Sequence, residues 1–131
     1  MALRVGIDLV SVQSVRDSLS AHGARYLERI YSEREVADCR DGETVDPERL
    51  AARFAAKEAA IKVLRPGDQA VPWQEIEVRR ETSGWVHLAL TGRAATLADE
   101  AHINDLALSL THEQGFASAV VIAEIRAAAD N

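Results

Sequence analysis

Apolar and polar residues alternate along five stretches of the chain, and a period of two is typical of β-strands with two different faces. The predicted strands cover residues 3–10, 75–80, 85–90, 106–111 and 116–125. The first strand has one wholly apolar face, with Leu3, Val5, Ile7 and Leu9, and an opposite face with Arg4, Gly6, Asp8 and Val10. Turns that contain glycine, at 81–84 and 113–115, join the later strands and indicate antiparallel pairing.

A helical pattern replaces the alternation between residues 50 and 64, where Ala, Leu, Lys, Glu and Arg predominate and Gly and Pro are absent. Asp46 before Pro47 is a candidate N-cap, and the sequence Arg65-Pro66-Gly67 ends the helix. Apolar side chains cover both sides of this helix, so it is predicted to be buried between other elements. Shorter helices are predicted at about 11–21, 24–30, 32–40 and 91–102, and residues 127–131 are predicted to be a frayed tail.

Hairpins separated by helices of unequal length favour an α+β fold, in which an antiparallel sheet packs against one long central helix and several short helices. At 131 residues the chain is predicted to be a single domain over 1–131. Ser32-x-x-Glu35 predicts a capping box at the start of one short helix. Neither G-x-G-x-x-G nor GK[ST] follows the first strand, which excludes Rossmann and P-loop folds.

The composition is that of an ordinary globular protein, with 47% apolar and 27% charged residues. No long apolar run and no charged-then-apolar leader occurs, so we expect neither a membrane span nor a secretory signal. Cys39 is the only cysteine, which excludes an intrachain disulfide and a cysteine-based zinc site and favours a reducing, cytoplasmic location. The net charge of −6 argues against nucleic-acid binding.

Asp8 is unusual because aspartate is disfavoured in the middle of a strand. Gly6 lies two places earlier on the same face, and its missing side chain leaves space beside the carboxylate. A bound cation or phosphate would need such space. The alternative is that Asp8 is a solvated residue on the outer face of the strand.

Charged residues also interrupt the apolar long helix, at Arg53, Lys57, Glu58 and Lys62. Charges are seldom buried without partners, so we expect this helix to offer them to a ligand or to another element. Glu58 and Lys62 are one turn apart, and the simpler interpretation is a surface ion pair with snorkelling lysines. Thr111-His112 at the end of a strand is the third polar group in an apolar element, after Asp8 and the charged residues of the long helix. The alternative to a ligand-binding role is a histidine whose hydrogen bonds are made within the protein.

Two carboxylates with several cations have the composition of a site for Mg²⁺ and a phosphorylated ligand. Mg²⁺ takes one or two protein carboxylates and completes its shell with water and phosphate oxygens. Lys, Arg and His side chains would offset the remaining phosphate charge. Spacing alone leaves open whether Asp8 and Glu58 meet in the fold.

Four blocks of the sequence resemble the holo-acyl-carrier-protein synthases, the small, one-domain type of 4′-phosphopantetheinyl transferase. In chain order they are VGIDLV at 5–10, LERIYSEREV at 27–36, RFAAKEAAIK at 53–62 and SLTHEQGFASAVVIAE at 109–124. The K-E-A-x-x-K core of the third block, with G-I-D near the N-terminus, is the family signature. The resemblance implies that the 4′-phosphopantetheine arm of coenzyme A is transferred to a serine of apo acyl carrier protein. Adenosine 3′,5′-bisphosphate is released, in a step of fatty acid or other lipid biosynthesis.

The resemblance also implies roles for residues of these three polar groups. Asp8 and Glu58 are implied to hold Mg²⁺, and Glu58 and Lys62 to be catalytic. The residues implied to bind coenzyme A are Arg53, Lys57, Lys62, Thr111 and His112. The base that takes the serine proton is either Glu58 or a metal-bound water, and the sequence does not separate these two. Larger two-lobed relatives carry an acidic residue where this chain has Val10, so water is expected to fill that ligand position.

The similar small enzymes are homotrimers that bind coenzyme A between protomers and dock an acidic carrier protein on their N-terminal helices. The resemblance places this docking at Arg16, Arg25 and Arg29, although Asp17 and Glu28 interrupt the basic face. The choice of carrier therefore stays open. Two rival functions also stay open: a non-catalytic module that binds coenzyme A or a carrier protein, and a Mg²⁺-dependent enzyme that uses water as the acceptor.

Overall fold

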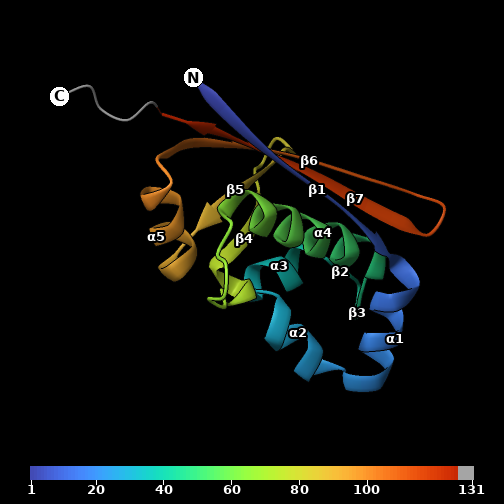
Figure 1. Ribbon diagram of the computed structural model, residues 1–131. Coiled ribbons are helices and arrows are strands. Elements are labelled where there is room, and N and C mark those ends of the chain that lie inside the picture. The colour runs from blue at the N-terminus through green and yellow to red at the C-terminus, as the bar shows by residue number, and fades with distance from the viewer. Residues whose placement is uncertain (127–131) are drawn as a thin grey trace.

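The computed structural model describes residues 1–126, and the predicted tail at 127–131 lies outside the described residues. A three-stranded antiparallel sheet has the strand order β1–β7–β6, and the long helix α4 packs along one of its faces (Figure 1). Their bounds are β1 Ala2–Ser11, β6 Ile103–Glu113, β7 Phe116–Ile125 and α4 Pro47–Leu64. This architecture confirms the predicted α+β class with an antiparallel sheet against one long helix.

Shorter elements pack around α4 on the sides that the sheet leaves free. They are α1 Val12–His22, α2 Ala24–Ile30, α3 Glu33–Asp38, β2 Arg40–Asp41, β3 Thr44–Val45, the 3₁₀ turn η1 Trp73–Glu75, β4 Ile76–Arg80, β5 Val86–Leu90 and α5 Gly92–Glu100. The strands β4 and β5 form a hairpin of their own and do not join the main sheet. The β2–β3 hairpin has two residues in each strand, too few to show an alternating pattern in the sequence.

Two elements begin three residues before the apolar pattern that predicted them, each for a local reason. Helix α4 begins at Pro47, as the candidate N-cap at Asp46 predicted, because the Asp46 carboxylate accepts a hydrogen bond from the Glu48 N–H at 2.9 Å and caps the helix there. Strand β6 begins at Ile103 rather than residue 106, because a register shift between Ile103 and Asp105 interrupts the alternation.

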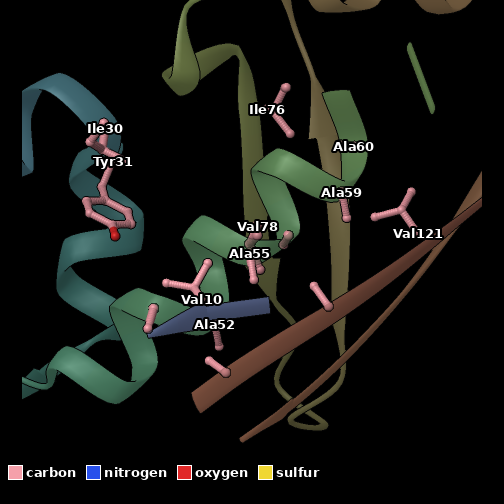
Figure 2. Close-up of a cluster of buried hydrophobic side chains, with 14 of the residues drawn as sticks. Val10, Ile30, Tyr31, Ala52, Ala55, Ala59, Ala60, Ile76, Val78 and Val121 are labelled. Atoms are coloured by element: carbon pink, nitrogen blue, oxygen red, sulfur yellow. The ribbon is translucent and has the colours of Figure 1, made fainter. Parts of the chain in front are cut away.

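Small side chains form the contact between α4 and the sheet. Strand β7 turns a buried row toward the helix, made of Ala117, Ala119, Val121 and Ala123. Figure 2 shows Ala52, Ala55 and Ala59 of α4 facing Val10 and Val121. Because these side chains are small, the helix backbone lies close to the strands, and polar groups on neighbouring elements can meet.

The other face of the sheet is uncovered in the single chain. The apolar row of β1 (Leu3, Val5, Ile7 and Leu9) is between 59% and 67% exposed, and Phe116 and Ile122 of β7 are exposed beside it. We call these six residues the uncovered sheet face. An apolar row of this extent is typical of an interaction surface. Within residues 1–126, none of the helices has the length and apolar character needed to cross a membrane.

Candidate active site

Gly6 of β1 sets the distance between the first strand and α4. A Cβ atom at this position would lie 2.1 Å from the carbonyl oxygen of Ala59 and 3.2 Å from Cβ of Lys62. The space beside Asp8 that the sequence assigned to a ligand is therefore occupied by the backbone of α4. The absence of a side chain at Gly6 has a different consequence, because it allows the helix to bring Glu58 and Lys62 up to Asp8.

Asp8 is held in place through only one of its two carboxylate oxygens. Lys62 donates from Nζ to the carbonyl oxygen of Ile7 at 2.6 Å and lies 3.3 Å from Oδ1 of Asp8. The other oxygen, Oδ2, is buried and has no hydrogen-bond partner among the described residues. A buried carboxylate oxygen without a partner is costly. This oxygen therefore has the capacity to bind a cation or a donor that comes with a ligand.

Glu58 lies beside Asp8, so two carboxylates share one small volume. The pKa of Glu58 is raised to about 7, chiefly by burial and also by the neighbouring Asp8 carboxylate, while the charge of Lys62 opposes the shift. Two adjacent carboxylates resist being ionised together unless a cation lies between them. Asp8, Glu58 and Lys62 thus meet in space, and we call these three residues the open cluster.

The donor set of the open cluster fits Mg²⁺ better than Zn²⁺. The residues 1–126 hold no group of three or more His, Cys, Asp or Glu side chains arranged for a metal ion. Zinc sites use three or four such protein ligands, whereas Mg²⁺ uses one or two carboxylates together with water and phosphate oxygens. Val10 lies in the buried core, so this position supplies no oxygen ligand.

Lys57 does not join the open cluster, although it precedes Glu58 in the chain. Its ammonium group donates to Oε1 of Glu35 at 2.7 Å, to the Trp73 carbonyl at 3.0 Å and to the Ile76 carbonyl at 2.6 Å, and the residue is 0% exposed. Burial lowers the pKa of Lys57, and Glu35 opposes this shift. An ammonium group has three N–H donors, and all three are used. The expectation that Lys57 contacts a phosphate of coenzyme A does not agree with this geometry.

Glu35 is the partner that the sequence did not reveal. The predicted capping box is confirmed, since Ser32 N donates to Oε1 of Glu35 and Glu35 N donates to the Ser32 hydroxyl. The second oxygen, Oε2, accepts from the Val78 N–H at 2.9 Å. Glu35 and Lys57 thus form a buried ion pair with every donor and acceptor engaged, and we call it the closed pair.

Arg53 lies near the closed pair and away from Asp8. Arg53 lies one turn before Lys57 on the same face of α4, so it shares the side of the helix that carries the closed pair. Arg53 is 5% exposed, its Nη1 donates to the Arg49 carbonyl at 3.4 Å, and its Nε has no partner among the described residues. Its donors are therefore only partly used.

Thr111 and His112 lie at the far end of β6, also apart from the open cluster. His112 is half exposed, and its Nδ1 lies 3.5 Å from Oε2 of Glu48, in the first turn of α4. Glu48 and Glu58 are ten residues apart, or about 15 Å along a helix. Thr111 pairs with Ser118, which pairs with Leu9, so Thr111 shares a row with the uncovered sheet face. A hollow of about 160 Å³ lies there.

Two of the three arginines predicted to dock a carrier protein line one hollow. Arg25 and Arg29 surround a volume of about 230 Å³ together with His22 and Tyr26. The sequence alone did not single out His22 and Tyr26. Arg25, Tyr26 and Arg29 have the spacing of one face of α2, which was the available signal, and His22 ends the preceding helix α1. Arg16 lies on α1 and does not line this hollow.

Known proteins match nearly the whole chain. The model of the 4′-phosphopantetheinyl transferase superfamily matches residues 4–121. A holo-[acyl-carrier-protein] synthase of Halothermothrix orenii is 38% identical over 120 residues, which cover 92% of this chain and 95% of the relative. One of Desulforudis audaxviator is 40% identical over 123 residues, covering 94% and 93% of the two chains.

Solved structures agree with the sequence relatives. The ACPS–CoA complex of Chronobacterium ammoniagenes superposes with a TM-score of 0.80 at 33% identity, covering 96% of this chain and 99% of that one. The holo-[acyl-carrier-protein] synthase of Helicobacter pylori in complex with coenzyme A has a TM-score of 0.80 at 28% identity, covering 92% and 100%. The similarity therefore includes the fold as well as the sequence.

Proposed function

The chain belongs to the 4′-phosphopantetheinyl transferase superfamily, and we propose that the open cluster of Asp8, Glu58 and Lys62 is the centre at which it works. The protein transfers the 4′-phosphopantetheine group of coenzyme A to a serine of apo acyl carrier protein. The products are holo carrier protein and adenosine 3′,5′-bisphosphate. The observation that carries the proposed centre is the buried, unpartnered Oδ2 of Asp8 next to the Glu58 carboxyl.

We propose that Asp8 and Glu58 hold a Mg²⁺ ion through their carboxylate oxygens. One oxygen of Asp8 is buried without a partner, and the proximity of the two carboxylates is unfavourable without a cation. When bound, Mg²⁺ supplies a Lewis acid that neutralises charge on the pyrophosphate oxygens of coenzyme A. Lys62 is half exposed, and its ammonium group lies at the edge of the cluster. There it can bind a phosphate oxygen of coenzyme A.

The reaction moves one proton and exchanges one P–O bond. The serine hydroxyl oxygen of the carrier attacks the β-phosphorus of coenzyme A, and the bond from that phosphorus to the bridging oxygen breaks. The departing group is the 5′-phosphate of adenosine 3′,5′-bisphosphate. We propose that the serine proton passes to Glu58, either directly or through a water held in the cluster. Positioning and charge neutralisation supply most of the catalysis in phosphoryl transfer, which agrees with a cluster that has no nucleophile of its own.

We further propose that the active assembly is a homotrimer in which the uncovered sheet face contacts a second copy. In one chain Arg53, Thr111 and His112 lie apart from the open cluster, while Thr111 borders the exposed row of β1. A neighbouring copy packed on this row would cover the apolar side chains and bring the end of one β6 near another protomer's site. Arg53 keeps donor capacity for an anion through its unpartnered Nε. Ile7→Asp should reduce the mass measured by light scattering to that of a monomer.

The docking surface for the acidic carrier is proposed at Arg16, Arg25 and Arg29, together with His22 and Tyr26. Support comes from the hollow that Arg25 and Arg29 share with those two residues. A cytoplasmic location agrees with Cys39, which is buried and unpaired. Arg25→Glu should raise the KM for the carrier far more than the KM for coenzyme A.

The decisive experiment is the intact mass of an apo acyl carrier protein after incubation with this protein, coenzyme A and Mg²⁺. We expect a gain of the phosphopantetheine mass that EDTA abolishes and that Asp8→Asn greatly reduces. If the carrier gains no mass while coenzyme A still stabilises the protein, the chain is a binding module. If coenzyme A is cleaved without a carrier, water is the acceptor.

A further inference from the structure

The closed pair of Glu35 and Lys57 lies next to the open cluster on the same helix. Lys57 and Glu58 are consecutive residues, so their side chains leave α4 about 100° apart. Lys57 points to the side of α4 that faces α3 and β4, where the Tyr31 ring lies 5.9 Å from its Nζ. Figure 2 shows α4 between Tyr31 on one side and Val121 of the sheet on the other. Any rotation of the helix that displaces Lys57 also displaces Glu58.

Hydrogen bonds from side chains hold both sides of α4 to the neighbouring elements. On the strand side, Arg4 donates to the Val63 carbonyl at 2.9 Å and Lys62 donates to the Ile7 carbonyl at 2.6 Å. On the opposite side, Lys57 alone makes three bonds, to Glu35 and to the carbonyls of Trp73 and Ile76. Most of the other buried residues of α4 are alanines, whose short side chains give the helix few long contacts to resist rotation.

Stability does not explain why two charges are buried here. A buried ion pair is seldom better for stability than well-packed apolar side chains, because both ions lose their hydration. The best supported use of such a pair is to fix register. The position of Glu58 relative to Asp8 depends on the rotation and the axial position of α4.

We propose that Glu35 and Lys57 are positioning residues for the open cluster, and that they fix the rotation of α4 at which Glu58 and Asp8 can share one cation. This inference rests on the proposed function, since it takes the open cluster as the cation site. Neither residue touches the substrate or the reacting atoms. Their effect passes through the backbone of α4 to Glu58, the next residue.

The test uses three variants of the full chain. Glu35→Gln keeps the shape of the side chain and removes its charge. The double variant Glu35→Met with Lys57→Met replaces both ions by apolar chains of similar length. Val78→Ala is the matched control, because it removes a buried side chain beside Glu35 and leaves its N–H in place. Binding of Mn²⁺ in the presence of coenzyme A is measured by electron paramagnetic resonance, below the unfolding temperature of each variant.

We expect the dissociation constant of Mn²⁺ to rise about 10-fold or more in Glu35→Gln and in the double variant, a typical effect of residues behind a metal ligand. Val78→Ala should bind Mn²⁺ within about twofold of the wild type even if its unfolding temperature is the lowest of the three. The Mg²⁺ concentration that gives half-maximal transfer should shift in parallel with the Mn²⁺ constant.

The inference is overturned if either folded variant binds Mn²⁺ as the wild type does, or if Val78→Ala weakens binding as much as Glu35→Gln. It is also overturned if Glu35→Gln does not fold at any temperature, because the pair would then serve stability first. Failure of the proposed function gives a different result: wild-type protein that binds no Mn²⁺, or an Asp8→Asn variant that binds it equally well.

Discussion

The two lysines of helix α4 form two lysine–carboxylate groups, which differ in the hydrogen-bonding capacity that each leaves unused. In the closed pair, Lys57 and Glu35 are 0% exposed and every donor and acceptor has a partner. In the open cluster, Lys62 is half exposed and one oxygen of Asp8 is buried without a partner. The residue types are the same, and the two lysines are five positions apart on one helix.

This difference separates a positioning role from a binding role. A group whose partners all come from the protein has no bond to offer, so it holds elements together. A group with a buried, unused oxygen beside a second carboxylate is incomplete until something else arrives. Charge and position in the signature motif do not distinguish the two lysines, whereas their remaining capacity does.

The largest expected effect is on turnover, from a change in the open cluster. Asp8→Asn should lower the rate of carrier modification by a factor on the order of 10²–10³, which is typical when one electrostatic contact at a reacting centre is lost. The unfolding temperature should stay the same or rise, because Asp8 no longer opposes the charge of Glu58. Time courses of carrier mass and thermal unfolding measure these two quantities.

Asp99→Asn is a suitable control for Asp8→Asn, because Asp99 is an exposed carboxylate of α5. It should leave both turnover and unfolding temperature unchanged. If an Asp8→Asn variant keeps full turnover, or loses turnover only because it unfolds, Asp8 has no direct part in the reaction.

The same substitution at the two lysines should give opposite results. Lys57→Met leaves Glu35 as a buried charge without its partner, and we expect the free energy of unfolding to fall by about 3–5 kcal/mol. Lys62→Met removes a half-exposed ion pair, and the free energy should change by at most about 1 kcal/mol while transfer is strongly reduced. Urea unfolding of both variants measures the first quantity, and the carrier assay measures the second. Equal loss of stability in the two variants would end the distinction between the closed pair and the open cluster.

Much of the fold follows from local sequence signals. Alternation predicted the long strands of the sheet, and the cap at Asp46 predicted a helix start near Pro47 that the structure shows. The main part that could not be predicted is which face of β1 the protein covers. The alternation identifies an apolar face, but α4 packs on the opposite face, beside Gly6, and the apolar row stays exposed in the single chain.

The proposed site could be predicted only for the residues that the family signature contains. The signature brought Asp8, Glu58 and Lys62 together, and the structure places these three side by side. It could not separate Lys57 from Lys62, because the partner of Lys57 is Glu35, 22 positions away, in a segment where the sequence indicated only a capping box. Partners that come from distant elements are fixed by packing, and no local pattern records them.

A smaller effect is expected from Gly6→Ala, which tests how the open cluster is assembled. The new Cβ would lie 2.1 Å from the Ala59 carbonyl oxygen, so the strand and helix must separate by about 1 Å to relieve the overlap. We expect the free energy of unfolding to fall by about 1–3 kcal/mol, as for other overpacked sites. Transfer should fall beyond what the folded fraction explains, since Asp8 moves away from Glu58. Ser109→Ala, exposed on the same sheet, is the control and should change stability by less than about 0.5 kcal/mol.

The smallest expected effect is on the reactivity of a thiol, which reports on the side of α4 that carries the closed pair. Cys39 is 0% exposed, and burial raises the pKa of its thiol to about 11. An ordinary cysteine has a pKa near 8.5, so at pH 8 the native thiol holds roughly a hundredfold or more less thiolate than the same thiol in urea, and iodoacetamide should alkylate it correspondingly slowly. Since Arg53 and Glu35 both affect this thiol, Lys57→Met should loosen its surroundings and speed alkylation, whereas Asp8→Asn should not. Mass spectrometry of the alkylated fraction against time measures the rates, and equal acceleration in both variants would mean that the two sides of α4 do not open independently.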